Sequence, residues 1–243
     1  MSKDTLSIII PTINEENGII KTLEDINRMK KQVKDTIKIE VIVVDGLSSD
    51  NTIKNAVDND AIIILETRKG KGIAMKTGVD NARGDIICFI DGDGTYSVKH
   101  IPIMFDILNR EKCDMVVGSR LLLGEGAYDT FKNYIDYKVA PWILSRYLKK
   151  FNTTEPSTGM RMMNKKTWYK MDLKADDFFI ELDIEVQMSK NHFSVIEIPV
   201  PCVPRIGKAK FTAEWKRVFE YIKFVDKNEK HLKNTLVKRI YVR

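Results

Sequence analysis

Short runs of β-branched and other apolar residues recur along the first half of the chain, at residues 6–10, 40–44, 61–65 and 86–90. Each run is followed by a polar or glycine-containing stretch. Nearly continuous apolar runs of this length are typical of strands that are buried on both faces. The pattern therefore predicts a series of buried strands.

The segments between these runs carry apolar residues at helical spacing, most clearly at residues 18–30, 52–57 and 73–82. Strands that alternate with helices favour a parallel, right-handed sheet. The predicted fold class is therefore α/β, with a doubly wound, mostly parallel sheet and helices on both of its faces.

The second half of the chain follows the same rules less regularly. Residues 98–109 are expected to form a helix, and residues 114–117 and 159–163 are expected to form strands. Residues 193–200 alternate weakly and end among prolines, which predicts a strand at an edge or end of the sheet. Residues 212–225 have an amphipathic helical pattern that is expected to continue toward the C terminus.

A chain of 243 residues indicates one large domain, or one domain with a small appendage. The main domain is predicted over residues 1–211 and a basic, amphipathic helical segment over residues 212–243. Within the main domain, residues 130–151 form an apolar, aromatic insert around a proline. This insert is expected to form two short helices that lie either in the core or on a membrane surface.

The net charge of +6 allows acidic partners such as nucleotides, nucleic acid or lipid phosphates. The chain begins with polar residues, and none of its apolar runs reaches the roughly 18 residues of a membrane span. The expectation is a cytoplasmic protein with reduced cysteines, whose contact with the cytoplasmic face of a membrane is peripheral.

Two carboxylates follow the fourth apolar run, within GDIICFIDGDGTY at residues 84–96. Asp91 and Asp93 would lie at the carboxyl end of a buried strand, where open α/β sheets bind ligands. Carboxylates beside flexible glycines suit Mg²⁺ or Mn²⁺ that is shared with phosphates. The competing interpretation is a solvated Asp-Gly turn.

Further polar residues follow the other predicted strands. Glu15 and Asp45 could accept hydrogen bonds from a ribose or a base, or could simply cap turns. The basic glycine turn RKGKG at residues 68–72 opens a helix and could cradle phosphates. The chain has neither a Walker A loop nor a GxGxxG after its first strand, so a dinucleotide-binding enzyme is disfavoured.

The motifs LSIIIPTINEE, EVIVVDGLSSDNT, RKGKGIAMKTG, GDIICFIDGDGTY and GSR together resemble the family-2 inverting glycosyltransferases of GT-A fold. The resemblance covers roughly residues 6–210 and is strongest to dolichyl-phosphate mannose or glucose synthases. It implies transfer of a single sugar, with inversion, from GDP-mannose or a UDP-hexose to a polyprenyl (dolichyl) phosphate, with Mg²⁺ or Mn²⁺ as cofactor. The alternatives are a glycan or small-molecule hydroxyl acceptor and, further off, a non-catalytic nucleotide-binding module or a sugar nucleotidyltransferase.

The resemblance also implies roles for individual residues. The implied catalytic residues are Asp91, Asp93, Arg120, Arg205 and Lys210, and the metal ligands are Asp91 and Asp93. The implied donor site consists of Pro11, Ile13, Glu15, Val44, Asp45, Lys71, Gly72, Asp91, Gly92 and Asp93. The candidates for the acceptor phosphate are Arg120, Arg161, Arg205, Lys208 and Lys210. Thr95 stands where a Gln often joins the metal site in the family, so the third metal ligand is left open.

The chemistry of the acceptor decides whether a general base is needed. A phosphomonoester has a second pKa of about 6 and is already anionic near neutral pH. A hydroxyl acceptor needs a base, which would have to come from Glu181, Asp183 or Glu185. These three could equally be the polar side of a helix or strand. No nucleic-acid partner is expected, and the oligomeric state is left open.

Overall fold

The computed structural model describes residues 5–123, 150–201, 203–207, 215–232 and 234–241. Most of the predicted apolar insert at residues 130–151 lies outside the described residues, as do Lys208 and Lys210.

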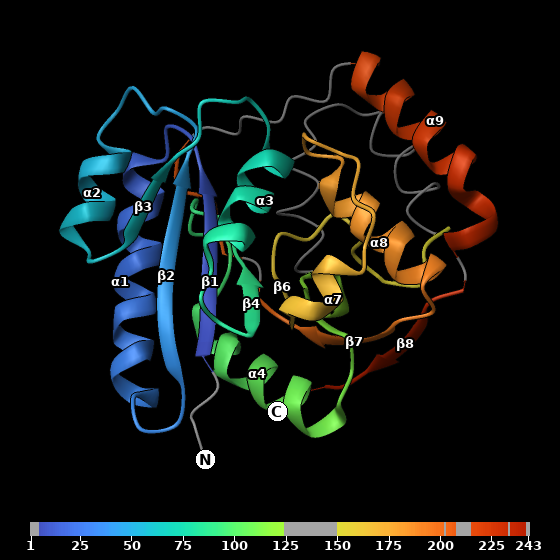
Figure 1. Cartoon of the computed structure of the whole chain (residues 1–243), viewed down its shortest axis with the longest axis horizontal. Coiled ribbons are helices and arrows are strands. Elements are labelled where there is room, and N and C mark those ends of the chain that lie inside the picture. The colour runs from blue at the N-terminus through green and yellow to red at the C-terminus, as the bar shows by residue number, and fades with distance from the viewer. Residues whose placement is uncertain (1–4, 124–149, 202, 208–214, 233, 242–243) are drawn as a thin grey trace.

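The described strands form one sheet of eight strands in the order β3-β2-β1-β4-β6-β5-β7-β8 (Figure 1). Strand β6 runs antiparallel to both of its neighbours, and all the other strands run in one direction. The carboxyl ends of those strands therefore all lie on the same side of the sheet, which is called its carboxyl-terminal side below. The strands are β1 (Thr5–Thr12), β2 (Lys38–Asp45), β3 (Ile62–Leu65), β4 (Ile86–Phe89), β5 (Met115–Ser119), β6 (Arg161–Asn164), β7 (Ser194–Pro199) and β8 (Leu236–Arg239).

Helices cover both faces of the sheet (Figure 1). Buried residues of α1, α2 and α4 pack on one face, and those of α3, α7 and α8 pack on the other. The helices are α1 (Glu16–Val33), α2 (Thr52–Asp58), α3 (Lys71–Asn81), α4 (Ile101–Glu111), α7 (Lys165–Tyr169), α8 (Ile180–Lys190) and α9 (Trp215–Leu232), with 3₁₀ turns at Val98–His100 and Leu121–Leu123.

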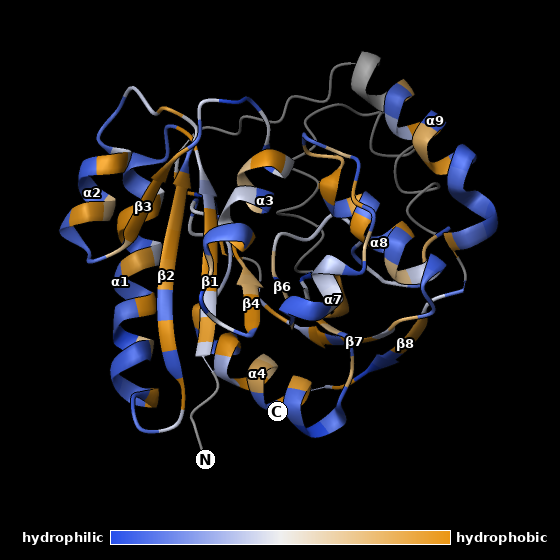
Figure 2. Ribbon diagram, in the orientation of Figure 1, coloured by the Kyte–Doolittle hydropathy of each residue, from blue (hydrophilic) through white to orange (hydrophobic). Residues whose placement is uncertain are grey.

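Alternation along the strands divides the core between the two faces. In β1, Ile8 and Ile10 belong to the cluster under α1 and α4, whereas Ile9 belongs to the cluster under α3 and α8. Successive strand side chains point to opposite faces, so a strand covered on both sides must be apolar throughout. Figure 2 shows this as orange central strands between helices that are blue on their outer sides.

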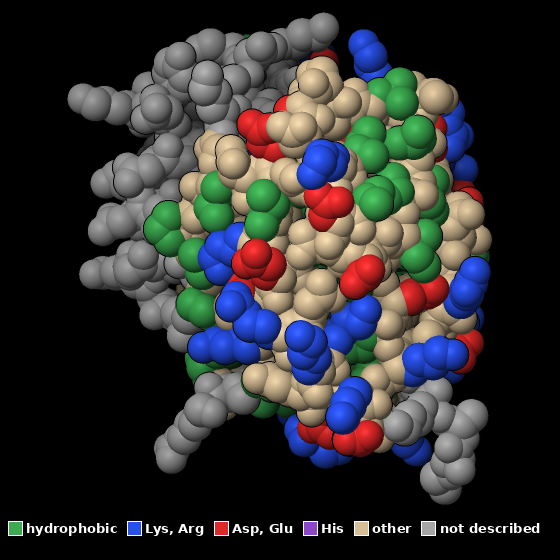
Figure 3. All heavy atoms as spheres, turned by 90° about the vertical axis from the view of Figure 1, so that its left-hand side faces the viewer, with side chains coloured by type: hydrophobic (Ala, Val, Ile, Leu, Met, Phe, Trp, Pro, Cys, Tyr) green, Lys and Arg blue, Asp and Glu red, His purple; other side chains and the backbone are tan. Residues whose placement is uncertain are grey.

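The two edges of the sheet differ in character. Strand β3 and the neighbouring helix α2 expose Val57, Ile62 and Leu65. Figure 3 views this side of the molecule and shows hydrophobic side chains gathered on part of it, with Lys and Arg spread over the rest. At the other edge, β8 carries Lys238 and Arg239, which pair with acidic side chains.

The predicted fold class, a doubly wound and mostly parallel sheet, is confirmed. Two details were wrong. Strand β7 lies between β5 and β8 and is not an edge strand. The segment after residue 211 is not wholly helical, because α9 ends at Leu232 and residues 236–239 form β8. The spacing of four between Leu232, Leu236 and Ile240 fits a strand period of 2 as well as a helical period, so the pattern alone was ambiguous.

In the part of the chain that the structure describes, no helix combines the length and the apolar character that crossing a membrane requires.

Candidate active site

The loops at the carboxyl ends of the strands bring together side chains that are far apart in the sequence. Glu15 follows β1, and Asp91 and Asp93 follow β4. Arg120 follows β5, and Arg205 lies in the loop after β7. The parallel sheet therefore assembles most of the predicted site residues on its carboxyl-terminal side, as expected for a ligand site in an α/β protein.

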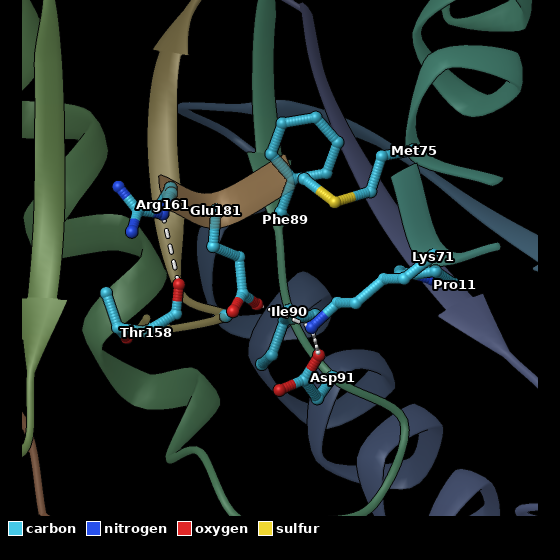
Figure 4. Close-up of a pocket in the computed structure, with 10 residues that line it drawn as sticks. Pro11, Lys71, Met75, Phe89, Ile90, Asp91, Thr158, Arg161 and Glu181 are labelled. Carbon is cyan, nitrogen blue, oxygen red and sulfur yellow. Dashed lines mark hydrogen bonds and ion pairs between the residues drawn. The ribbon is translucent and has the colours of Figure 1, made fainter. Parts of the chain in front are cut away.

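Asp91 faces a small pocket and is paired with a buried lysine. The Nζ of Lys71 lies 2.7 Å from Oδ1 of Asp91 and 2.6 Å from Oε1 of Glu181. Figure 4 shows the lysine reaching from α3 to a point between the two carboxylates. Pro11 and Gly159 also line this pocket.

The charges of this trio depend on one another. Burial would lower the pKa of Lys71, but Asp91 and Glu181 outweigh it and raise that pKa, so the amine stays protonated. Burial would raise the pKa of Asp91, but Lys71, Arg120 and Arg205 outweigh it, and the net shift is downward. For Glu181, burial prevails over Lys71 and raises the pKa. Of the two carboxylates, Asp91 therefore has the lower pKa relative to its ordinary value.

Asp93 is held by a second cation from the other side. Nη1 of Arg205 lies 2.9 Å from Oδ2 of Asp93, and Nη2 of the same guanidinium pairs with Glu15. The hydroxyl of Thr95 donates to Oδ1 of Asp93 at 2.6 Å. The backbone N–H of Ile206 donates to the carbonyl of Asp93 at 3.0 Å, which fixes the loop that carries Arg205.

The residues on the carboxyl-terminal side of the sheet fit a hard divalent cation. Asp91 and Asp93 offer carboxylate oxygens, which Mg²⁺ and Mn²⁺ prefer, and each already attracts a cationic side chain. Among the described residues, no group of three or more His, Cys, Asp or Glu could hold a metal.

The loops after β1 and β2 are tied together. Asp45 is fully buried and accepts hydrogen bonds from the backbone and hydroxyl of Ser48 at 2.7 and 2.6 Å. The backbone N–H of Glu15 donates to the hydroxyl of Thr52 at 2.7 Å. The carboxylate of Asp45 is thus engaged in shaping its own turn, and Glu15 is the carboxylate that reaches Arg205.

The other donor-site candidates fall into different environments. Val44 is buried in the core and Ile13 is largely exposed. Lys71 and Gly72 open α3 beside the Asp91 pocket.

Two backbone N–H groups at the basic glycine turn are bonded within the protein. The N–H groups of Gly72 and Ile73 donate to the carbonyls of Asp177 and Asp176, at 3.2 and 3.1 Å. Arg68, which was predicted to join the cradle, pairs with Glu66 and lowers its pKa to about 2. Of the predicted phosphate-binding groups in this turn, only Lys71 reaches the Asp91 pocket in the described structure.

Arg120 is held by two residues that the sequence did not single out. Its backbone N–H and Nε donate to the buried carboxylate of Glu155, each at 2.7 Å. Its guanidinium carbon lies 4.7 Å from the ring centroid of Tyr96. Glu155 is 35 residues away in the chain, and no motif links it to Arg120.

Arg161 and the acidic residues of α8 divide into separate roles. The guanidinium of Arg161 is fully buried and pairs with Glu185, and its Nε donates to the carbonyl of Thr158 at 3.0 Å. Asp183 accepts two backbone N–H groups of residues 174–175. Of the three acidic candidates, Glu181 therefore shares the pocket of Asp91, whereas the other two stabilise neighbouring segments. Arg161 lines the same pocket as Asp91, although its side chain has no solvent-exposed surface.

Comparison with known proteins identifies relatives. The model of the family described as glycosyl transferase family 2 matches residues 7–170. The chain is 29% identical over 220 residues to the low-salt glycan biosynthesis hexosyltransferase Agl6 of Haloferax volcanii, which covers 88% of this chain and 52% of that protein. It is 25% identical over 207 residues to a dolichyl-phosphate hexose transferase of the same organism, covering 85% and 86%.

The chain spans 52% of Agl6 and 64% of a second relative, the Haloferax volcanii glycosyltransferase AglJ. Among solved structures, it is similar to glucosyl-3-phosphoglycerate synthase from Mycobacterium tuberculosis in complex with Mn²⁺, UDP and glucosyl-3-phosphoglycerate. The TM-score is 0.68 at 18% identity, covering 93% of this chain and 80% of that one. This likeness confirms the GT-A fold, and the match of the family model over most of the chain shows that it belongs to glycosyl transferase family 2.

Proposed function

We propose that this chain transfers a single hexose, with inversion and with Mg²⁺ or Mn²⁺, from a nucleoside diphosphate sugar to a polyprenyl phosphate. The observation that carries the proposal is the arrangement of side chains in and around the loop that follows β4. Asp91 and Asp93 meet Lys71 and Arg205, which come from separate loops. Carboxylates that can bind a metal ion and basic side chains that can bind phosphates thus lie together on the carboxyl-terminal side of the sheet.

The relatives support this choice of substrates without deciding it. One is a dolichyl-phosphate hexose transferase. Another is the dodecaprenyl-phosphate galacturonate synthase of Rhizobium johnstonii, 33% identical over 130 residues, which cover 51% of this chain and 38% of that protein. Solved neighbours contain UDP with Mn²⁺ or Mg²⁺. A polyprenyl-phosphate acceptor would place the reaction at a membrane surface.

In the proposed mechanism, Asp91 and Asp93 would hold the cation through their carboxylate oxygens. When bound, a divalent cation stabilises the negative charge that develops on the leaving nucleoside diphosphate. Arg205 can exchange its carboxylate partners for phosphate oxygens, because the guanidinium binds either group through the same donors. Arg120, oriented by Glu155, supplies a further cation for a phosphate at the end of β5.

A phosphate acceptor requires little else from the protein. Its oxygen is anionic near neutral pH, since the second pKa of a phosphomonoester is about 6, so no side chain has to remove a proton. The task of the site is then to align acceptor and donor for in-line displacement through an oxocarbenium-like transition state.

Glu181 favours a second candidate, in which the acceptor is a hydroxyl. Its carboxylate lines the pocket of Asp91, and burial raises its pKa toward the range that suits a general base. In the described structure this carboxylate is bound to Lys71, which would have to release it.

The test incubates the chain with Mn²⁺, dolichyl or dodecaprenyl phosphate and radiolabelled GDP-mannose or UDP-glucose in parallel. Labelled product is expected in the organic phase after extraction. Asp93→Asn should lower turnover by at least about 100-fold, since it weakens a direct charge interaction with the reacting groups. Asp106→Asn is the matched control, because Asp106 is exposed on α4 and pairs only with Arg110 among the contacts described.

Wild-type turnover by Asp93→Asn would reject the metal and donor site proposed here. If a glycan with free hydroxyls replaces the lipid phosphate, a labelled glycan that is separated from the donor and is lost in Glu181→Gln would instead support the hydroxyl acceptor. Label in the organic phase that persists in Glu181→Gln would support the lipid phosphate.

A further inference from the structure

Tyr96 lies three residues after Asp93 and is only 4% exposed. Its hydroxyl accepts the backbone N–H of Gly159 at 2.7 Å and lies 3.2 Å from Oγ1 of Thr158. Thr158 donates its single hydroxyl hydrogen to the carbonyl of Gly118 at 2.8 Å. Tyr96 must therefore be the donor to Thr158. Its hydroxyl then accepts one bond and donates one, in a chain of hydrogen bonds with a fixed direction.

This chain of bonds joins three parts of the site. Tyr96 belongs to the loop after β4, Gly118 to β5, and Thr158 and Gly159 to the segment that leads into β6. Burial raises the pKa of Tyr96, so the hydroxyl keeps its proton at neutral pH.

Gly159 in turn lies against the carboxylate of Asp91. A Cβ atom on Gly159 would lie 2.4 Å from Oδ2 of Asp91, which is far inside van der Waals contact. The backbone at Gly159 thus bounds the carboxylate on one side, and Lys71 holds it at 2.7 Å through Oδ1. Any shift of Gly159 would change the space that Asp91 occupies.

The ring of Tyr96 contacts a second site residue. The guanidinium carbon of Arg120 lies 4.7 Å from the ring centroid, within the range of cation–π contact. Glu155 binds the same guanidinium through its carboxylate. Arg120 is therefore held by two residues, the ring of Tyr96 and the carboxylate of Glu155.

We propose that Tyr96 is a positioning residue of this site, whose hydroxyl holds Gly159 against Asp91 and whose ring orients Arg120. The inference rests on the proposed function, which assigns Asp91 to the metal and donor. Outer residues that orient metal-binding carboxylates typically change metal affinity by tenfold or more when they are removed. Tyr96 would act on the metal site in this way, without touching the metal.

The test compares Tyr96→Phe with Tyr221→Phe. The first variant removes the bridging hydroxyl and keeps the ring under Arg120. The second removes a buried hydroxyl that has no hydrogen-bond partner in the described part of the structure. Mn²⁺ is titrated into the full-length chain and followed by electron paramagnetic resonance, and thermal unfolding is recorded for each protein. Tyr96→Phe is expected to bind Mn²⁺ about tenfold more weakly than wild type, and Tyr221→Phe is expected to bind it equally well.

Equal Mn²⁺ affinity for wild type and Tyr96→Phe would overturn the inference, even if the variant were less stable, because that result leaves Tyr96 a purely structural role. Failure of the wild-type chain to bind Mn²⁺ would instead count against the proposed function. In that case crystal structures of wild type and Tyr96→Phe decide the positioning role. An unchanged Asp91 carboxylate rejects it, and a carboxylate displaced or spread over two positions supports it.

Discussion

At the scale of single residues, the pocket depends on an amine shared by two carboxylates. Lys71 and Asp91 were both expected at the site, because each follows a strand in a recognisable motif. Their contact with Glu181 was not foreseeable, since Glu181 is 110 residues further along than Lys71 and its α8 pattern fitted a helix or a strand equally well. The sequence could therefore predict which residues lie on the carboxyl-terminal side of the sheet, but not how their charges are paired.

Lys71→Met is expected to destabilise the protein. Removing one partner of a buried ion pair typically costs about 3–5 kcal/mol, because the other charge stays buried without compensation. In the variant, Lys71 no longer opposes the burial that raises the folded-state pKa of Glu181. At Asp91, only Arg120 and Arg205 still oppose burial. Stability is then lost as the pH rises through the folded pKa values, so the deficit relative to wild type should grow from about pH 4 toward neutrality. Urea unfolding at several pH values measures it.

Lys76→Met is the control on the same helix, because Lys76 is partly exposed and its partner Asp176 is largely exposed, so the pair should be worth at most about 1 kcal/mol. Adding Glu181→Gln to Lys71→Met removes one of the uncompensated charges and should restore part of the stability and flatten its pH dependence. If the loss of stability in Lys71→Met relative to wild type did not change with pH, the pairing of Lys71 with Asp91 and Glu181 would be contradicted.

At the scale of elements, the start of α3 shows how a distant loop can engage amides that the local pattern leaves open. The glycine turn predicted the helix start, and free N–H groups at a helix start do bind anions. Here the loop at residues 175–177 supplies backbone carbonyls to Gly72 and Ile73 instead. That loop lies about a hundred residues away in the chain, so local pattern could not reveal it. Glycine is required because the two backbones approach closely.

Gly72→Ala should separate these two segments. A Cβ at this position would lie 2.6 Å from the carbonyl oxygen of Ala175, a backbone atom that cannot turn aside. The expected loss is about 2–3 kcal/mol, measured by urea unfolding, together with lower transferase activity because Lys71 moves with the helix start. Gly46→Ala is the control for stability, since its Cβ would meet nothing closer than 3.6 Å. Equal stability of the two variants would show that the loop yields easily.

At the scale of the whole molecule, the chain folds as one sheet that extends beyond its most recognisable part. The strands and helices of the first half were predicted closely, because each is a buried strand or an amphipathic helix with clear turns between them. The second half was predicted less well. Strand β6 enters between β4 and β5, and β8 joins the far edge of the sheet. Such pairings join segments that are distant in sequence, and the local spacing of apolar residues does not predict which strands pair.

The family model ends at residue 170, yet the core does not. Strand β7 pairs with β5 from Met115 to Ser119, and α8 contributes Ile180, Ile184 and Met188 to the core cluster over β1 and β4. A chain that stops at residue 170 would expose this apolar surface and leave β5 as an unprotected edge. We expect it to show helical far-UV circular dichroism but no cooperative thermal transition, and to aggregate. A chain that stops at residue 240 loses only the last three residues, of which the described one, Tyr241, is largely exposed, and should unfold like the full chain. A cooperative transition in the chain of 170 residues would show that the matched segment is a folding unit by itself, and that the sheet beyond it serves only the active site.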